Sequence, residues 1–468
     1  PAGTMASGWS CWVLLLLLPV LAHAGGPGPV LVNRPFVTIW NIPTERCAQK
    51  YDVNLNLEIF DVLANDQQSF TGQDITLFYS NRLGLLPYYT ADGVPVNGGL
   101  PQNASLEAHL HQATRDIEAT LPSPAYNGLA VIDWEKWRPL WIRNWGSMDI
   151  YRQKSEGLVR QQHPQWPPEQ VKEVAKQQFE RSARDFMEQT LQLGEKLRPD
   201  GYWGFYGFPN CYNNDFHSQP FTGMCPAVEQ QRNQELQWLW KSSRALYPSI
   251  YLPPILNGTN KALAYVRHRV AEAFAVQRGV LDSGIPVLPY SQIAFDSTVD
   301  FLSQEDLMNT IGESAAQGAA GIILWGSLNY SNSKVSVAGD TARGDPPPSP
   351  GRAALCHFAM LQEMCLRLKD YVEGPLGHYI VNVTASADLC SQSLCSGRGR
   401  CVRQEDRQGF LHLDPSRFAI DLQAGKPWLV AQSLEPSGDD ISRLAQEFSC
   451  QCYDKWQGPR CDTQGFAE

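Results

Sequence analysis

Gly128-Leu129-Ala130-Val131-Ile132-Asp133-Trp134-Glu135 joins a run of apolar residues to two carboxylates. The apolar run predicts a buried β-strand. Because side chains alternate along a strand, Asp133 and Glu135 share one face about 6.6 Å apart, and Trp134 takes the other face. Neighbouring carboxylates cannot both ionise freely, so the pKa of one should be raised, which suits proton donation near neutral or acidic pH. Most Asp-x-Glu pairs are solvated surface, but the position of this one at a strand end favours a catalytic pair.

Further apolar runs of strand length recur along the chain, with helical patterns between many of them. The runs are Phe36–Trp40, Ile75–Tyr79, Leu129–Asp133, Tyr202–Phe208, Ser249–Leu252, Pro286–Ile293 and Gly321–Trp325. Apolar residues three or four apart predict helices over Val171–Leu191, Glu235–Leu246 and Val266–Val276. Strands that alternate with helices favour the α/β class, with a parallel sheet and crossover helices. Barrels of this class place active sites at the C-terminal strand ends, where Asp133, Glu135, Tyr206, Tyr251, Asp296 and Trp325 fall.

The composition and net charge of the chain limit the classes of molecule that it can bind. The chain has 468 residues, more than one average domain, and a net charge of −10. An acidic protein is a poor nonspecific binder of nucleic acid, so we expect no nucleic-acid partner. A polyanionic substrate would need a local basic patch, for which Arg138, Arg143, Arg152 and Arg269 are the candidates. The alternative is that most of these arginines are ordinary surface or ion-pair residues.

The N-terminal residues predict a signal segment. An apolar run from Trp12 to Leu21 ends in Ala22-His23-Ala24, a sequence of the A-x-A cleavage type, and the run is too short to span a bilayer comfortably. Removal of residues 1–24 would place the protein in the secretory pathway, in lysosomes or outside the cell. No apolar tail follows Cys461, so we expect no membrane anchor.

Twelve cysteines occur in this secretory context, where disulfides persist. Cys11 lies in the signal segment. The last six have the spacing of an epidermal-growth-factor-like (EGF-like) module, and spacing alone leaves their connectivity open; they are Cys390, Cys395, Cys401, Cys450, Cys452 and Cys461. A metal site is the competing interpretation, but no histidines interleave at ligand spacing. We therefore expect neither a metal nor another cofactor.

Several longer motifs resemble those of the vertebrate and venom hyaluronidases. They are Val131-Ile132-Asp133-Trp134-Glu135 with Trp137-Arg138-Pro139, Trp203-Gly204-Phe205-Tyr206-Gly207-Phe208-Pro209, Ala245-Leu246-Tyr247-Pro248-Ser249-Ile250-Tyr251, Gly312-Glu313-Ser314-Ala315-Ala316, Gly318-Ala319-Ala320-Gly321 and Leu324-Trp325-Gly326. The resemblance covers about residues 34–334 and 363–462. It implies a distorted (β/α) TIM-like barrel over residues 25–385 and an EGF-like module with a tail over 386–468. It also implies the disulfides Cys47–Cys365, Cys211–Cys225, Cys390–Cys401, Cys395–Cys450 and Cys452–Cys461, which leave Cys356 over.

Asp133 and Glu135 share one strand, so they cannot easily flank a sugar as the two carboxylates of an ordinary retaining glycosidase do. This favours substrate assistance, and the resemblance implies the same for β-1,4 links of hyaluronan, with chondroitin a further candidate substrate. Glu135 would be general acid and base, Asp133 would raise the pKa of Glu135 and help hold the acetamido group, and Tyr251 and Tyr206 would stabilise developing charge. The resemblance also implies cleft residues that contact sugar or steady the carboxylates, namely Asn41, Tyr79, Arg138, Ser249, Arg269, Asp296 and Trp325.

Purely structural roles are the alternative for these residues. The aromatic ones could be plain barrel core, and Asp296 could be a strand-end cap or an ion-pair residue. At the level of function, a catalytically weak hyaluronan-binding or adhesion protein on the same fold is the alternative to a hydrolase. We expect a monomer. Four glycosylation sequons begin at Asn103, Asn257, Asn329 and Asn382.

Two stretches depart from the family pattern. Asn210 stands where the family typically has aspartate, and this could shift the pH optimum. Residues Val335–Gln362 form an atypical insertion whose Gly344–Pro350 part, rich in proline, favours extended or disordered chain. We hypothesise that this insertion is a retained intron or a gene-prediction error, which transcript sequencing across the junction would decide.

Overall fold

The computed structural model describes residues 28–280, 284–327, 350–423, 426–431 and 437–465. The predicted signal segment and the sequon at Asn329 lie outside the described residues. The strands are β1 (Val37–Asn41), β2 (Val62–Ala64), β3 (Ile75–Tyr79), β4 (Tyr88–Tyr89), β5 (Pro95–Val96), β6 (Leu129–Asp133), β7 (Tyr202–Phe205), β8 (Tyr290–Gln292), β9 (Gly321–Trp325), β10 (Gly399–Arg403), β11 (Phe418–Gln423), β12 (Lys426–Ala431), β13 (Phe448–Cys452), β14 (Trp456–Gln457) and β15 (Thr463–Gln464). The helices are α1 (Glu45–Tyr51), α2 (Leu106–Thr120), α3 (Asp149–Gln162), α4 (Pro168–Leu197), α5 (Ala227–Glu235), α6 (Gln237–Lys241), α7 (Lys261–Gly279), α8 (Gln304–Leu307), α9 (Glu313–Ala316), α10 (Pro350–Tyr371), α11 (Gly377–Cys395) and α12 (Gly438–Glu447), with short 3-10 and π-helical segments between them.

Seven parallel strands form the centre of the fold, as the alternation of strands and helices predicts. They lie in two hydrogen-bonded sheets, in the orders β2-β1-β9-β8 and β3-β6-β7. Isolated parallel bridges continue the array, because Tyr206 pairs with Tyr247, Leu246 with Val287 and Ser249 with Tyr290. The segment 246–249 therefore lies between β7 and β8. The described strands form one curved array from β2 to β3.

This array is not closed among the described residues, so the predicted distorted TIM-like barrel is confirmed in its parallel strands but not in closure. Strands β2 and β3 are not paired through their backbones in the described structure. Instead the side chain of Asn65, just after β2, spans the gap: Nδ2 donates to the Ile75 carbonyl at 2.6 Å, and Oδ1 accepts from the backbone N–H groups of Asp74 at 3.0 Å and Ile75 at 3.1 Å. One amide side chain thus replaces a backbone ladder at this point.

Prolines explain where predicted strands are shorter or absent. Ser249–Leu252 was predicted as a strand, but among its residues only Ser249 forms a bridge. Pro248, Pro253 and Pro254 surround it, and proline has no N–H group to donate to a ladder. The predicted strand Pro286–Ile293 is reduced to Tyr290–Gln292 for the same reason, since it contains Pro286 and Pro289.

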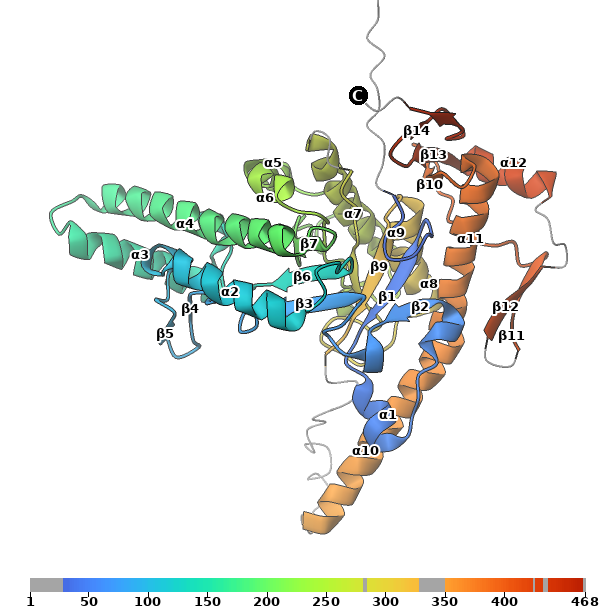
Figure 1. The fold of residues 1–468 in the computed structure, drawn as a ribbon, viewed down its shortest axis with the longest axis horizontal. Helices are drawn as coiled ribbons and strands as arrows, with labels where there is room; N and C mark the ends of the chain where they lie inside the picture. Colours follow the sequence, from blue (N-terminus) through green and yellow to red (C-terminus); the bar gives the residue numbers. More distant parts are fainter. Residues whose placement is uncertain (1–27, 281–283, 328–349, 424–425, 432–436, 466–468) are drawn as a thin grey trace, which may run out of the picture.

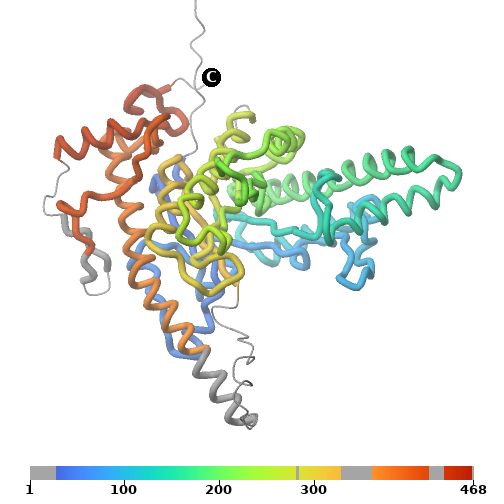
Figure 2. Tube along the Cα trace, turned by 180° about the vertical axis from the view of Figure 1, so that it is seen from behind, coloured from blue at the N-terminus to red at the C-terminus, as the bar shows by residue number. Residues whose placement is uncertain are grey.

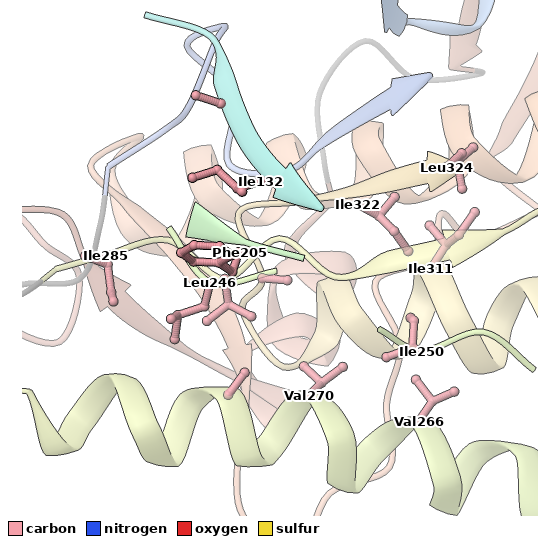
Figure 3. Packing of buried hydrophobic residues seen from close by; sticks show 14 of the residues in the cluster. Ile132, Phe205, Leu246, Ile250, Val266, Val270, Ile285, Ile311, Ile322 and Leu324 are labelled. Carbon is pink, nitrogen blue, oxygen red and sulfur yellow. The ribbon is translucent and has the colours of Figure 1, made fainter. Parts of the chain in front are cut away.

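Alternating side chains divide the apolar residues into an inner and an outer layer. The inner layer is a buried cluster that includes Ile39, Leu77, Val131, Tyr247, Tyr290 and Ile323. The outer faces of the same strands pack on the surrounding helices, and Figure 3 shows Val266 and Val270 of α7 on the side of the helix that faces Ile250. Burial on both faces is why these strands read as continuous apolar runs.

Helix predictions succeed where the apolar period is long. The pattern over Val171–Leu191 corresponds to α4, which begins at Pro168, and that over Val266–Val276 to α7. In Figure 1 α4 and its partner α3 project from one side of the sheet, and Figure 2 shows the same projection from behind. The predicted helix Glu235–Leu246 is only partly confirmed: the helix breaks at Leu236, and α6 covers Gln237–Lys241 alone.

The C-terminal part is cross-linked by disulfides, and α11 connects it to the main domain. The structure contains the five disulfides that the resemblance implies. Strands β10 and β13 pair antiparallel, and the long loop between Cys401 and Cys450 carries β11, β12 and α12. The boundary predicted near residue 385 falls inside α11, so one continuous helix runs from the main domain into the disulfide-rich region (Figure 1).

Part of the predicted extended insertion is helical, which corrects the expectation for Val335–Gln362. Helix α10 begins at Pro350 and contains residues 350–362, whereas 335–349 lie outside the described residues. Leu361 is buried in a small cluster with Cys47, Tyr51, Val53 and Cys365. The sequence after Pro350 contains Ala353, Ala354 and Leu355, which are good helix formers.

Within the described part of the chain, no helix has the length and apolar character needed to cross a membrane.

Candidate active site

The predicted site residues gather at the carboxyl ends of the parallel strands. Tyr79 is paired in register with Asp133 at the ends of β3 and β6, and Asn41 with Trp325 at the ends of β1 and β9. Gln292 at the end of β8 is also paired with Trp325. Parallel register places strand ends along one rim, so residues far apart in sequence meet there.

Asp133 is the carboxyl group whose pKa is raised. Burial of its side chain raises the pKa to about 7, the charge of Glu135 acts in the same direction, and Arg138 opposes both. The buried oxygen Oδ1 has no hydrogen-bond partner. One raised pKa was predicted for the pair and assigned to Glu135, but the raised pKa belongs to Asp133, and burial contributes more to it than the neighbouring carboxylate does. A carboxyl group with a free oxygen and a pKa near neutrality can exchange a proton with a ligand.

Glu135 has the opposite environment two residues further on. Its side chain is 59% exposed, and Oε1 lies 3.4 Å from Nη2 of Arg138. The carboxylate is therefore accessible from the rim and held on one side by a cation. The pair combines one buried carboxyl with one open to a bound molecule.

The back of this strand is anchored by a buried histidine that sequence reasoning missed. Trp134 packs edge-on against His109 at 5.5 Å and Phe205 at 5.4 Å between ring centroids. Nδ1 of His109 accepts from the Leu85 N–H at 2.9 Å, and Nε2 lies 2.9 Å from Oγ1 of Thr190. Burial lowers the pKa of His109 to about 4, so the ring is neutral. The histidine thus fixes the tripeptide from behind.

Aromatic side chains line the rim beside the carboxylates. Tyr251 stacks on Trp325 with 5.8 Å between ring centroids and 15° between planes, and it lies 6.0 Å from the ring of Tyr206. The Tyr206 hydroxyl donates to Oγ of Ser249 at 3.4 Å. Burial raises the pKa of Tyr79 to about 12 and also raises that of Tyr206, so both hydroxyls remain proton donors.

These aromatic residues are neither pure core nor pure surface. Tyr79, Tyr206, Tyr251 and Trp325 pack against the inner apolar cluster but are only partly buried. Asn41 lies deeper: it is 0% exposed, and neither its amide nitrogen nor its oxygen has a hydrogen-bond partner. Buried polar atoms without partners are uncommon and mark places where a ligand or water can be held.

The four arginines of the predicted basic patch are all engaged. Arg138 faces Glu135, Arg143 pairs with Glu229, and Arg152 pairs with Asp149. Arg143 and Arg152 therefore fit the ion-pair alternative.

Arg269 is engaged as well, and its partners are polar groups of the rim. It donates to Oδ1 of Asn213 at 2.9 Å, to Oδ1 of Asn214 at 2.9 Å and to the Ser249 carbonyl at 2.8 Å. Its position supports the Ser249 segment.

Asp296 lies at the edge of the site. It is exposed, its Oδ1 accepts from Nε2 of Gln292 at 3.4 Å, and its backbone N–H donates to the Leu252 carbonyl. Tyr290 was missed by sequence reasoning although its strand was predicted. Its ring packs edge-on against Tyr206 at 5.1 Å, and its buried hydroxyl has no partner. The alternation of inward positions in Pro286–Ile293 is the signal that could have identified it.

Comparisons with known proteins agree with this geometry. A family model described as hyaluronidase matches residues 26–339 and 355–465. Hyaluronidase-1 of Homo sapiens is 48% identical over 457 residues, which cover 97% of this chain and 98% of that protein. A hyaluronidase of Crotalus adamanteus is 39% identical to this chain, and the match covers 98% of this chain and 97% of that protein. A crystal structure of bee venom hyaluronidase in complex with a hyaluronic acid tetramer is similar with a TM-score of 0.63 and 30% identity, covering 74% of this chain and 98% of that one. This chain therefore belongs to the hyaluronidase family and is an enzyme of the hyaluronidase type.

Proposed function

We propose that this protein is an endo-β-N-acetylhexosaminidase that hydrolyses the β-1,4 links of hyaluronan with retention of configuration. The observation that carries the mechanism is the contrast between Asp133, whose Oδ1 is buried at the end of β6, and the exposed Glu135 two residues later. Two carboxylates two residues apart at one strand end cannot lie on opposite faces of a sugar as nucleophile and acid. The acetamido carbonyl of the substrate then serves as the nucleophile, attacking its own anomeric carbon.

Glu135 is the group placed to move the proton. Its exposed carboxyl protonates the leaving glycosidic oxygen, and in the second step the carboxylate takes a proton from the water that opens the cyclic intermediate. Arg138 at 3.4 Å stabilises the carboxylate between the two steps. One residue thus serves both half-reactions.

Asp133 acts on the acetamido group. As the carbonyl oxygen of that group attacks, positive charge develops at its nitrogen, and the N–H becomes a stronger donor. The unpartnered Oδ1 of Asp133 is a free acceptor for it, and a pKa near 7 makes this carboxylate a stronger base than an ordinary aspartate. Tyr251 and Tyr206 supply neutral hydroxyl donors to the same group.

The relatives support hyaluronan as the substrate, since the bee venom enzyme was crystallised with a hyaluronic acid tetramer. Our further proposals are a monomer of the secretory pathway, lysosomal or secreted, with residues 386–468 as an EGF-like module. We also propose glycosylation at Asn103 and Asn257, which are exposed, and at Asn382, whose Oδ1 accepts from the Leu413 N–H.

Product analysis tests this function. Purified protein is incubated with hyaluronan and with chondroitin from acidic to neutral pH, and the products are followed by size and by NMR of the new reducing ends. We expect even-numbered oligosaccharides from hyaluronan whose first-formed ends are β. An α-anomer released first excludes the substrate-assisted mechanism, and binding without cleavage would favour the adhesion alternative.

A further inference from the structure

A small cavity beside Glu135 is lined by three arginines and no carboxylate. We call it the arginine pocket; its polar lining residues are Arg138, Arg143, Asn210, Tyr212, Arg232 and Asn233. Arg138 connects it to Glu135, and Gly207 and Phe208, which directly follow Tyr206, form part of its wall. The pocket therefore adjoins two segments that carry the proposed chemistry.

Carboxylates outside the lining hold the arginines in place. Glu229, whose side chain is 8% exposed, pairs with Arg143 through one oxygen and accepts from Nη1 of Arg232 at 2.6 Å through the other. Glu272 accepts from Nδ2 of Asn233 at 2.8 Å and does not line the pocket either. The two carboxylates thus hold Arg143, Arg232 and Asn233 from outside the lining.

The charges of the neighbouring guanidinium groups also affect the pKa of Arg143. Burial lowers the pKa of Arg143 to about 10; its contact with Tyr212 opposes this, whereas the charges of Arg232 and Arg138 act with burial. Cζ of Arg143 lies over the Tyr212 ring, 3.7 Å from its centroid, while Arg138 and Arg232 keep 20% and 24% of their side chains exposed. Two of the three cations can therefore be reached from outside.

The size of the pocket limits the ligand. Its volume is about 20 Å³, on a scale where one water molecule needs about 10–15 Å³. That is room for the oxygens of one small anionic group and not for a sugar ring. Arginine binds carboxylates through two parallel hydrogen bonds, which matches a planar group of this size.

We propose that the arginine pocket binds one uronate carboxylate of the polymer lying in the cleft, and that Asn210 sets the charge of the pocket. This inference rests on the proposed function. Asn210 lines the pocket as a neutral amide whose Oδ1 accepts from the Tyr212 N–H at 3.1 Å. An aspartate, which the family typically has at this position, would place a negative charge among the arginines and repel the incoming carboxylate, so the proposed contact is a feature of this chain and not of the family.

Two variants and one control test the pocket. Asn210→Asp adds a charge with almost no change of shape, and Arg232→Gln removes one donor while leaving the Arg143–Glu229 pair intact. Arg244→Gln is the control, because Arg244 is 49% exposed, pairs with Glu195 at 3.4 Å and does not line the pocket. Each is assayed for KM and kcat on hyaluronan at low and high salt, with melting temperatures measured alongside.

We expect both pocket variants to raise KM for hyaluronan about tenfold at low salt, with kcat within about twofold of native, as loss of a charge-assisted contact predicts. The difference should shrink at high salt. In a Glu135→Gln background, Kd should rise similarly for hyaluronan oligosaccharides and stay unchanged for oligosaccharides whose uronate carboxyls are reduced to alcohols.

An unchanged KM for both variants, or an equal loss of affinity on the carboxyl-reduced oligosaccharides, overturns the proposal. A loss confined to sulfated chondroitin would assign the pocket to a sulfate ester and overturn the uronate assignment. If Arg232→Gln does not fold, the nearly isosteric Asn210→Asp decides alone. Failure of the native protein to cleave hyaluronan would instead contradict the proposed function.

Discussion

Asp133 and Glu313 both have buried carboxylate oxygens, but the surroundings of these oxygens differ. Glu313 in α9 is 0% exposed and accepts from Nε of Arg267 at 2.9 Å, from Nη1 and Nη2 of Arg403 at 2.8 and 2.6 Å, and from Nε2 of Gln317 at 3.0 Å. Asp133 keeps one buried oxygen with no partner and a pKa raised to about 7.

The difference separates a structural role from a functional one. The partners of Glu313 come from α7, β10 and the residue directly after α9, so this cluster joins the disulfide-rich region to the main domain. A buried group without a partner costs about 1–3 kcal/mol, and Asp133 keeps such a group at the rim of the site. Removing each carboxylate should therefore affect different measurements.

Glu135→Gln should give the largest effect. The amide keeps the shape of the side chain but has no proton to donate, and the same residue serves both half-reactions. General acid–base groups contribute about 10²–10⁴-fold, so we expect a loss of kcat at the upper end of that range or beyond. Binding of hyaluronan should persist, as calorimetry can measure. A variant that retains about a tenth of the native rate would exclude Glu135 as the acid.

Asp133→Asn should lower kcat by about 10²–10³-fold with no loss of thermal stability. An amide has only one acceptor atom, so it can accept the acetamido N–H through its oxygen but not through its nitrogen. It also lacks the negative charge that stabilises the positive charge developing on the acetamido nitrogen. Because Asp133 is not satisfied in the free protein, the melting temperature should stay the same or rise. A large fall in melting temperature would give Asp133 a structural role like that of Glu313.

Glu313→Gln should destabilise the fold and spare the chemistry. Removing one partner from a buried ion cluster typically costs about 3–5 kcal/mol, because Arg267 and Arg403 are left without a counter-charge. We expect poor secretion, a lower melting temperature and near-native kcat per folded molecule. Glu195→Gln is the matched control: this exposed carboxylate pairs with Arg244 at 3.4 Å, and its loss should cost no more than about 1 kcal/mol.

A further effect should appear in the pH dependence of stability. The folded pKa of Asp133, about 7, lies above its ordinary value of 3.8, so between these values the folded state binds a proton that the unfolded state has lost. This contribution is complete below about pH 4 and disappears as pH rises to 7, at up to about 1.4 kcal/mol per pH unit. The melting temperature of Asp133→Asn relative to native should therefore rise from pH 4 to pH 7; a flat difference would contradict the raised pKa.

Long periodic patterns made most of the fold predictable. The runs at β1, β3, β6 and β9 and the patterns of α4 and α7 agree with the structure to within a few residues. Strand β2 was missed because it has only three residues, and Ser249–Leu252 was overpredicted because its apolar residues outweighed the neighbouring prolines. A local apolar pattern does not show which backbone N–H and C=O groups are able to pair with a neighbouring strand.

The sequence predicted which residues belong to the site better than it predicted their burial and their hydrogen-bond partners. The strand end identified both carboxylates, but which of them is buried depends on packing from other strands. The partners of Arg269 lie 55 and 56 residues away on a loop, so its engagement could not be inferred from its own helix. His109 gave no signal, because a histidine on an amphipathic helix is usually unremarkable in sequence.

The disulfide between Cys47 and Cys365 joins residues 318 positions apart. Except for Asn41, every residue assigned to the site, from Tyr79 to Trp325, lies inside the loop of chain that this bond closes. A protease that cuts the backbone once anywhere between the two cysteines would therefore yield two polypeptides still joined by a covalent bond. Such a nicked enzyme would migrate as one species on a gel without reductant and as two with it, and it could stay active while appearing cleaved.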